Sequence, residues 1–395
     1  MNKSSFPGNP DISLVIKAVI CFIVSTVCLI LPACSEEKDA ETPARQTLLV
    51  YLIGDNNLYP YLNENLDAIE EGVKNTDDFS CNLLIYIDSY RELPYLYKIE
   101  KDKHGNVSSH IIKEYPEQNS ADKEIMSAII QDVLGSYPAE QTGLILGSHA
   151  TSWFPQDFLT ITSRSFGDDN GAVMEIDELA EALPENGFDY ILFDACYMAN
   201  AECVYELRNK TDYIVASSSE IMDIGFPYSD IIPLLLEQQP QLEAVANTYY
   251  SFYNQKRGLY KSASISVVNT AHLDELASIM REITTDFGIE NIYNLPKGDL
   301  QFLEKLLPEN KPAFLYDLGD YVLNIATDEQ YSRFNKILEN VVEVKYNTPS
   351  VFYGNHQCHY PLDKYSGLSI YIPQKEYPEL DDWYTRLQWW HSVYE

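Results

Sequence analysis

The 395-residue sequence predicts an α/β fold built on a mostly parallel central sheet. Two observations predict it. Short apolar runs alternate along the chain with segments whose apolar residues recur at steps of three and four, which is the order of strands and helices in such folds. The apolar runs are also nearly continuous, as expected for strands that are covered on both faces of a sheet. No internal repeat divides the chain.

The first half supplies most of the expected elements. Thr47–Ile53 predicts a strand, followed by a turn at 54–57 and a helix through Leu58, Leu62, Leu66, Ile69 and Val73. A strand at 82–88, a hairpin of 95–100 with 107–113, and a helix at 124–134 come next. We expect that helix to point Ile125, Ala128, Ile129 and Val133 inward. Further strands are expected at 143–147, 190–194 and 213–216, and helices at 176–183 and 200–208.

Beyond about Pro240 the chain is more helical and richer in tyrosine. A strand is expected at 262–268, helices at 270–287 and 331–344, and a late strand, GLSIYI, at 367–372. We therefore divide the body into a core, 47–240, and a C-terminal region, 241–395. The late strand favours a C-terminal region that completes the same sheet over one that forms a separate domain.

The N-terminal residues carry the features of an export signal. Lys3 and Lys17 precede an uncharged apolar run at 18–31, which is too short to span a membrane comfortably and suits the core of a signal peptide. The run ends in Leu-Pro-Ala-Cys, which predicts lipidation of Cys34 and removal of residues 1–33. Residues 34–46 then form a flexible acidic tether. These features predict an exported outer-membrane lipoprotein, facing the cell surface or the periplasm; a plain cleaved signal is the alternative.

The composition argues against nucleic acid as a partner and against a disulfide-linked scaffold. With 27 Lys+Arg against 60 Asp+Glu the formal net charge is −33, and no basic stripe offers a nucleic-acid surface. A hydrophobic content of 45% is that of a globular protein, so the acidity does not indicate disorder. The four cysteines outside the signal and Cys34 are too scattered for a disulfide framework.

Two residues follow strands at positions where α/β enzymes place reactive groups. His149 comes after GLILG and Ser148, and Cys196 comes after YILFD and Ala195. We expect a helix to begin shortly after Cys196, so that its dipole favours the thiolate. A histidine on the neighbouring strand end could then protonate a leaving amine. Either residue alone is more often structural, and it is their joint placement that predicts a cysteine nucleophile with a histidine acid/base.

Two other motifs have weaker chemistry. His356, Cys358 and His359 could hold a soft metal, but a fourth ligand is not evident and a turn or surface role is favoured. Asp168-Asp169-Asn170-Gly171 offers calcium-type oxygens without a complete calcium loop. We expect no metal at the catalytic centre and no required cofactor, with a structural calcium ion as an open alternative.

Several blocks in order resemble the clostripain-like cysteine peptidases, relatives of the caspases, legumain and gingipains. They are LLVYLIGDNNL, His149 with Ser152-Trp153, FGDD at 166–169, MEIDELAEAL, FDACYMANAECVYEL and DYIVASSSEIMDIGFPY. The resemblance runs from about Thr47 to Tyr228, with weaker echoes at SASISVVN and GLSIYIP. It implies a caspase-like α/β/α sandwich and an exported endopeptidase that cuts protein or peptide substrates.

The resemblance also implies roles for individual residues. Cys196 is the nucleophile and His149 the acid/base, with the oxyanion served by the backbone N–H groups of Ala150 and Cys196. The family usually has glycine where this chain has Ala150.

Relatives typically cleave after Arg or Lys and line their specificity pocket with acids. Asp194 matches the family's acidic position, and Glu220 and Asp223 lie in a segment that could add a second charge. For Asp194, a turn carboxylate satisfied by backbone N–H groups is about as good an interpretation. Some relatives cleave themselves between the histidine and the cysteine, where Arg164 is the only basic residue.

Two other functions stay open. A catalytically silent lipoprotein could use a peptidase cleft to bind peptides or glycans, and Ala150 and the many tyrosines keep that alternative. A glycosidase has many carboxylates available, but no spacing singles out a pair. We expect a monomer that contacts the membrane only through a lipid on Cys34.

Overall fold

A computed structural model describes Met1 and residues 44–156, 158, 165–307 and 311–395. The predicted signal peptide, Cys34 and Arg164 lie outside the described residues. Ala44–Glu395 forms one compact unit. Its first strand begins at Ala44, so residues 44–46 belong to this strand and the prediction of a tether reaching residue 46 is wrong there.

Nine strands of the described chain form the central sheet, in the order β12-β10-β9-β8-β5-β1-β2-β3-β4. The five central strands are parallel, and two antiparallel strands flank them on each side. The strands are β1 (Ala44–Gly54), β2 (Cys81–Ser89), β3 (Tyr95–Lys101), β4 (Val107–Glu114), β5 (Ala139–Gly147), β8 (Phe188–Asp194), β9 (Thr211–Ala216), β10 (Ser264–Asn269) and β12 (Val342–Asn347).

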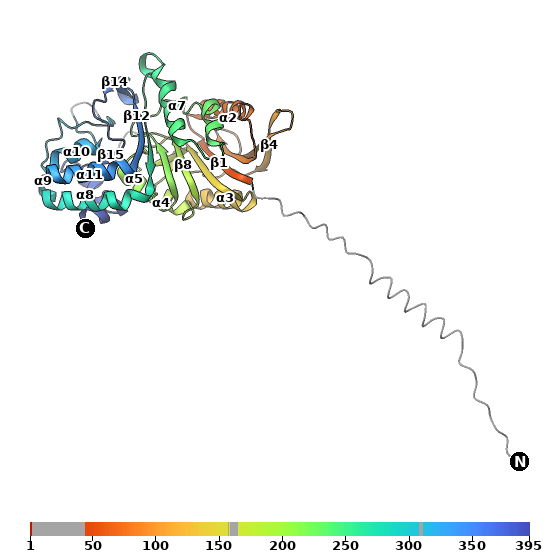
Figure 1. Ribbon diagram of the computed structural model, residues 1–395, viewed down its shortest axis with the longest axis horizontal. Coiled ribbons are helices and arrows are strands. Elements are labelled where there is room, and N and C mark those ends of the chain that lie inside the picture. Colours follow the sequence, from red (N-terminus) through yellow and green to blue (C-terminus); the bar gives the residue numbers. More distant parts are fainter. Residues whose placement is uncertain (2–43, 157, 159–164, 308–310) are drawn as a thin grey trace. The chain divides into compact units, whose positions relative to one another are not determined.

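Helices cover both faces of this sheet, as Figure 1 shows. One face packs against α2 (Tyr59–Lys74), α6 (Tyr228–Leu235) and α7 (Leu242–Asn254). The other face packs against α3 (Lys123–Ser136), α4 (Ile176–Ala182), α5 (Ala201–Glu206) and α8 (Leu273–Phe287). Helices α10 (Leu318–Ile325) and α11 (Asp328–Val341) and the C-terminal helices belong to the same core. The expected α/β/α sandwich with a mostly parallel sheet is confirmed.

The central strand β1 shows why the apolar run predicts this layering. Leu49, Tyr51 and Ile53 are buried in the core on one face, and Leu48, Val50 and Leu52 in the core on the other. Because successive side chains point to opposite faces, a strand buried on both sides must be apolar at every position.

Helix α3 shows how local side chains set the start of a helix and its inward face. Asp122 caps α3 by accepting hydrogen bonds from the N–H groups of Glu124 and Ile125. The inward face of α3 differs from the expectation in one residue, since Ala128 is exposed while Met126 and Ile130 are buried. A small side chain adds little apolar area, so the larger neighbours decide which way the helix turns.

The C-terminal region departs from two expectations. The helix predicted at 331–344 is α11 (Asp328–Val341), and the chain then turns directly into β12. This region contributes β10 and β12 to the central sheet. The GLSIYI segment does not join it, because β15 (Ser369–Tyr371) pairs with β11 (Leu315–Asp317) in a separate two-stranded sheet.

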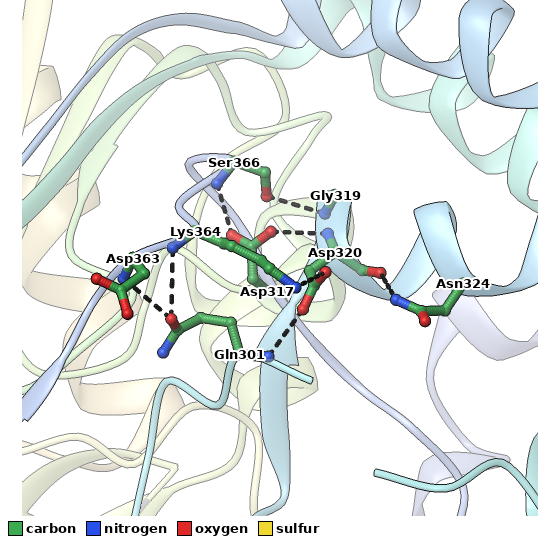
Figure 2. A network of polar contacts seen from close by, with 8 residues as sticks. All are labelled: Gln301, Asp317, Gly319, Asp320, Asn324, Asp363, Lys364 and Ser366. Carbon is green, nitrogen blue, oxygen red and sulfur yellow. Dashed lines mark hydrogen bonds and ion pairs between the residues drawn. The ribbon is translucent and has the colours of Figure 1, made fainter. Parts of the chain in front are cut away.

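A polar network holds β11 and α10 (Leu318–Ile325) to the loop before β15 (Figure 2). The Asp317 carboxylate accepts from the N–H groups of Ser366 at 2.5 Å and Asp320 at 2.9 Å. Lys364 Nζ donates to Asp320 Oδ1 at 2.7 Å, and the N–H of Gln301 donates to Asp320 Oδ2 at 2.8 Å. The bonds of Ser366 and Lys364 join segments more than forty residues apart in sequence.

The remaining described elements are short. They are β6 (Phe166–Asp169) with β7 (Ala172–Met174), the hairpin β13 (Ser350–Tyr353) with β14 (Cys358–Pro361), α9 (Ile289–Tyr293), α12 (Pro378–Tyr384), α13 (Gln388–Tyr394) and single 3-10 turns at 258–260, 270–272 and 354–356. No helix in the described part of the chain has the length and apolar character that a bilayer span requires.

Candidate active site

A cavity of about 360 Å³ opens at the carboxyl ends of β5 and β8. These strands are parallel neighbours, with Gly147 opposite Asp194, so the residues just beyond them emerge side by side. We call this the strand-end cavity. Its lining includes His149, Cys196, Asp194, Glu220 and Asp223. The structure therefore brings together the two residues predicted as reactive and the three predicted as acidic pocket residues.

Asn57, which the sequence analysis did not single out, holds the His149 ring. Its Oδ1 lies 2.8 Å from His149 Nε2. Because an amide oxygen can only accept, this contact suits a proton on Nε2, and the Asn57 amide orients the ring. Asn57 follows β1 in the GDNN turn, and β1 is the direct neighbour of β5. That adjacency could have identified it.

Cys196 contacts the backbone of Ile221. Its Sγ accepts from the Ile221 N–H at 3.3 Å and lies 3.7 Å from the Ile221 carbonyl oxygen. Burial, with the nearby Glu220 carboxylate second, raises the pKa of the Cys196 thiol to about 12. The thiol is therefore protonated at neutral pH in this conformation.

The expectation of a thiolate at a helix start is wrong. Helix α5 begins at Ala201 and is capped by Asn200, so four residues separate it from Cys196. Tyr197, in this connection, has a φ of 62°, which turns the chain away from a helical path. The helix dipole acts over the first turn only, so burial and Glu220 dominate.

Glu220 lines the cavity, yet both of its oxygens already have partners. Oε1 accepts from Tyr197 OH at 2.9 Å, and Oε2 accepts from the N–H of Gly354 at 2.8 Å. Glu220 thus ties the turn after Cys196 to the β13–β14 hairpin, whose residues Phe352 and Gln357 also line the cavity. Its geometry is that of a clamp.

Asp194 is buried at the base of the cavity. Its Oδ2 accepts from Tyr228 OH at 2.9 Å and from the N–H of Phe226 at 3.4 Å. Burial raises the pKa of this carboxyl to about 6, against the lowering effect of those two hydrogen bonds. Gly225 faces it closely with a φ of +63°, so the wall at this point has room only for glycine. Both interpretations of Asp194, turn carboxylate and cavity acid, describe its position.

Asp223 lies at the rim of the cavity and is partly exposed. Its Oδ1 accepts from Tyr260 OH at 3.2 Å, and Tyr260 is itself part of the lining. Asp194 at the base and Asp223 at the rim therefore place two carboxylates in the wall of the cavity.

Ala150 is buried and bridges to Phe166 of β6. The carbonyl of the preceding His149 accepts the N–H of Gly167 at 2.9 Å. Ala150 does not adopt a left-handed backbone conformation, so its methyl group introduces no dihedral strain.

The side chains of the two weaker sequence motifs already make hydrogen-bond contacts within the protein. His356 Nε2 lies 3.0 Å from the carbonyl of Leu307, and His359 Nε2 lies 2.8 Å from the carbonyl of Leu259. Among the described residues, no group of three or more His, Cys, Asp or Glu side chains could hold a metal ion. Asp168 Oδ1 accepts the N–H of Gly171, and Asp169 accepts the N–H of Ser120.

Comparison with known proteins gives consistent results. The sequence model described as "Clostripain family" matches residues 50–394. Clostripain of Hathewaya histolytica is 27% identical over 221 residues, an alignment that spans 47% of this chain and 41% of that protein. The chain thus matches about two fifths of the length of this curated relative.

Two solved structures align with this chain over nearly their whole length. An inactive zymogen C11 protease from Parabacteroides distasonis is 37% identical, with a TM-score of 0.81 over 90% of this chain and 99% of that one. A secreted C11 cysteine protease from Bacteroides thetaiotaomicron, in complex with an irreversible peptide inhibitor, is 28% identical, with a TM-score of 0.77 over 88% and 98%.

Proposed function

The chain belongs to the clostripain family, and we propose that it is a cysteine endopeptidase that cuts after Arg or Lys. The observation that carries this proposal is the strand-end cavity, where Cys196 and His149 share one lining with the carboxylates of Asp194 and Asp223. A thiol and an imidazole that line the same cavity suit acyl transfer.

The residues divide the reaction between them. His149 accepts the Cys196 proton as Sγ attacks the scissile carbonyl carbon, and it then protonates the departing amine. A thioester remains on Cys196, and water hydrolyses it with His149 as the base. The N–H groups of Ala150 and Cys196 stabilise the oxyanion. Asn57 keeps the imidazole in the required tautomer. Because the thiol is protonated at rest, the nucleophile forms by this proton transfer.

The predicted preference for basic residues rests on charge. Asp194 and Asp223 attract an Arg or Lys side chain that enters the cavity, and the remaining acidity of the chain draws such substrates over longer range. Glu220, a predicted substrate ligand, acts instead by holding the hairpin in place, since Tyr197 and Gly354 occupy its oxygens.

Fluorogenic peptides ending in Arg, Lys or Leu test the activity. We expect turnover of the Arg and Lys peptides, no turnover by Cys196→Ala, and normal turnover by Cys358→Ala, a matched cysteine on β14. Leu peptides cleaved as fast as Arg peptides would contradict the specificity. Activity retained in Cys196→Ala would contradict the mechanism.

A catalytically silent peptide- or glycan-binding protein is the second candidate, because burial and Glu220 disfavour the Cys196 thiolate. The 37% identical relative from Parabacteroides distasonis is an inactive zymogen. Tight binding of an Arg peptide without turnover would select this candidate.

We also propose processing at Arg164. Wild-type protein should then be clipped while Arg164→Ala stays intact, and unchanged clipping would reject this site.

Export and anchoring complete the proposal. The secreted Bacteroides relative supports export, and a lipid on Cys34 would fix the protein to the outer membrane. Metabolic labelling with an alkyne fatty acid should mark wild type and leave Cys34→Ala unlabelled. We further propose a monomer that requires no cofactor, since thiol–imidazole chemistry needs none. Sedimentation and full activity in a chelator test these two points.

A further inference from the structure

A second, larger cavity of about 670 Å³ shares no lining residue with the strand-end cavity. It lies between the loop after α9, the segment leading into β11 and the segment after β15. Four lysines line it: Lys297, Lys305, Lys311 and Lys375. We call it the basic cavity. Such a concentration of positive charge stands out in a chain with a net charge of −33.

The charge of Lys297 is only partly balanced by nearby carboxylates, of which Glu376 also lines the cavity. The side chain is partly buried, and burial lowers the pKa of its ammonium despite the opposing attraction of Glu376 and Asp381. Asp381 is already engaged, because it accepts from Tyr371 OH at 2.7 Å and from the N–H of Gln374 at 3.3 Å. No carboxylate of the described chain lies within ion-pair distance of Lys297 Nζ. An anion in the cavity would restore the balance.

Lys305 and Lys375 are held in place mainly by hydrogen bonds to neutral oxygens. Lys305 Nζ donates to the carbonyl of Lys311 at 2.8 Å. Lys375 Nζ donates to Asn294 Oδ1 at 3.0 Å, and its 3.6 Å pairing with Glu290 is between two exposed side chains, which makes it weak. Hydrogen bonds to neutral oxygens therefore hold the ammonium groups of Lys305 and Lys375 at the cavity wall.

Gln374 supplies a separate indication of a ligand. It is fully buried and lines the cavity. Its Nε2 donates to the carbonyl of Ala313 at 2.7 Å, but Oε1 has no hydrogen-bond partner in the described part of the chain. Because an unpaired buried acceptor is unfavourable, a donor such as a hydroxyl group would be bound there.

We propose that the basic cavity binds a small hydroxylated anion, a phosphate or sulfate ester of a sugar. The ester oxygens accept from the lysines, and a hydroxyl group donates to Gln374 Oε1. The rings of Tyr293, Phe302 and Tyr316 in the lining provide apolar surface for the carbon skeleton. The volume is that of a small-molecule site.

Calorimetric titration of the full-length protein tests this site independently of peptidase activity. The probes are glucose 6-phosphate, glucose 6-sulfate and glucose. We expect saturable binding of at least one ester, at least about tenfold tighter than glucose, because charge-assisted hydrogen bonds are the stronger contacts. The ester that binds more tightly identifies the anionic group.

Two lysine variants provide the matched comparison. Lys297→Gln should weaken ester binding by about tenfold, whereas Lys256→Gln, the same charge change over the Phe252 ring and outside the cavity, should leave it unchanged. Lys375→Gln, at an exposed position, replaces Lys297→Gln if that variant does not fold by circular dichroism. The proposal is overturned by the absence of saturable binding at millimolar ester, by glucose binding as tightly as both esters, or by equal weakening in the cavity variant and Lys256→Gln.

Discussion

Replacing Gly225 by alanine perturbs the close contact between Gly225 and the Asp194 carboxylate in the wall of the strand-end cavity. A methyl group at this position would overlap Asp194 Oδ2 and lie 3.0 Å from Oδ1, and the backbone φ is +63°. The left-handed conformation costs alanine about 1–2 kcal/mol. Displacing the carboxylate also removes its bond from Tyr228 OH, worth about 1.5–3 kcal/mol for a charged acceptor. We therefore expect the free energy of unfolding to fall by about 2.5–5 kcal/mol.

Gly258→Ala separates the two contributions. Gly258 has a φ of +61°, and an added methyl group meets nothing within 4 Å, so this variant should lose only the dihedral part. Urea unfolding followed by circular dichroism measures both variants. When Asp194 is already alanine, the Asp194 oxygens that the new methyl group would overlap are gone. In that background Gly225→Ala should lower the free energy of unfolding by no more than Gly258→Ala does. Equal losses for Gly225→Ala and Gly258→Ala in the wild-type background would refute the contact.

Three further predictions concern the titrating groups. Asn57→Ala should lower kcat on an Arg peptide at least about tenfold with little change in KM, because the His149 ring loses its orientation; an unchanged kcat contradicts that role. Glu220→Gln should speed iodoacetamide labelling of Cys196 near about pH 8, since the nearby charge that helps raise the thiol pKa is removed; mass spectrometry showing equal rates contradicts it. Burial raises the pKa of Glu202 from 4.5 to about 7, so the folded state binds this proton more tightly than the unfolded state, and the free energy of unfolding should fall as pH rises between those values, by up to about 1.4 kcal/mol per unit. Urea titrations at several pH values should show a shallower dependence in Glu202→Gln, and an identical dependence would exclude Glu202 as its source.

Much of the architecture was predictable because its signals are local. The buried parts of strands β1 and β5 are continuous apolar runs. In α2 the apolar residues recur at steps of three and four because they share one face of the helix. The position of His149 and Cys196 followed from the same signals, since both come directly after buried strands that pair in the sheet.

The misplaced features depend on partners distant in sequence. The first residues of β12 were predicted as the end of a helix because their side chains are compatible with both helix and strand. Pairing with β10 selects the strand. The raised pKa of the Cys196 thiol comes first from burial and second from Glu220, which lies near it only because the chain crosses beside the end of β8. The helix predicted at 200–208 does begin at Ala201, but the four residues between it and Cys196 are enough to remove the dipole effect on the thiol.

The sequence by itself determined the layered α/β fold, the strand-end positions of the two residues predicted as reactive and the acidic character of the chain. Those properties follow from side-chain periodicity and residue type, which each segment carries alone. Only the tertiary structure decided that Asn57 holds His149, that Gly225 confines Asp194, and that four lysines of an acidic chain face one cavity. The first two are contacts between residues dozens of positions apart, and the third gathers separate segments of the chain. Their energies depend on distance and burial, quantities that exist only once the chain has folded.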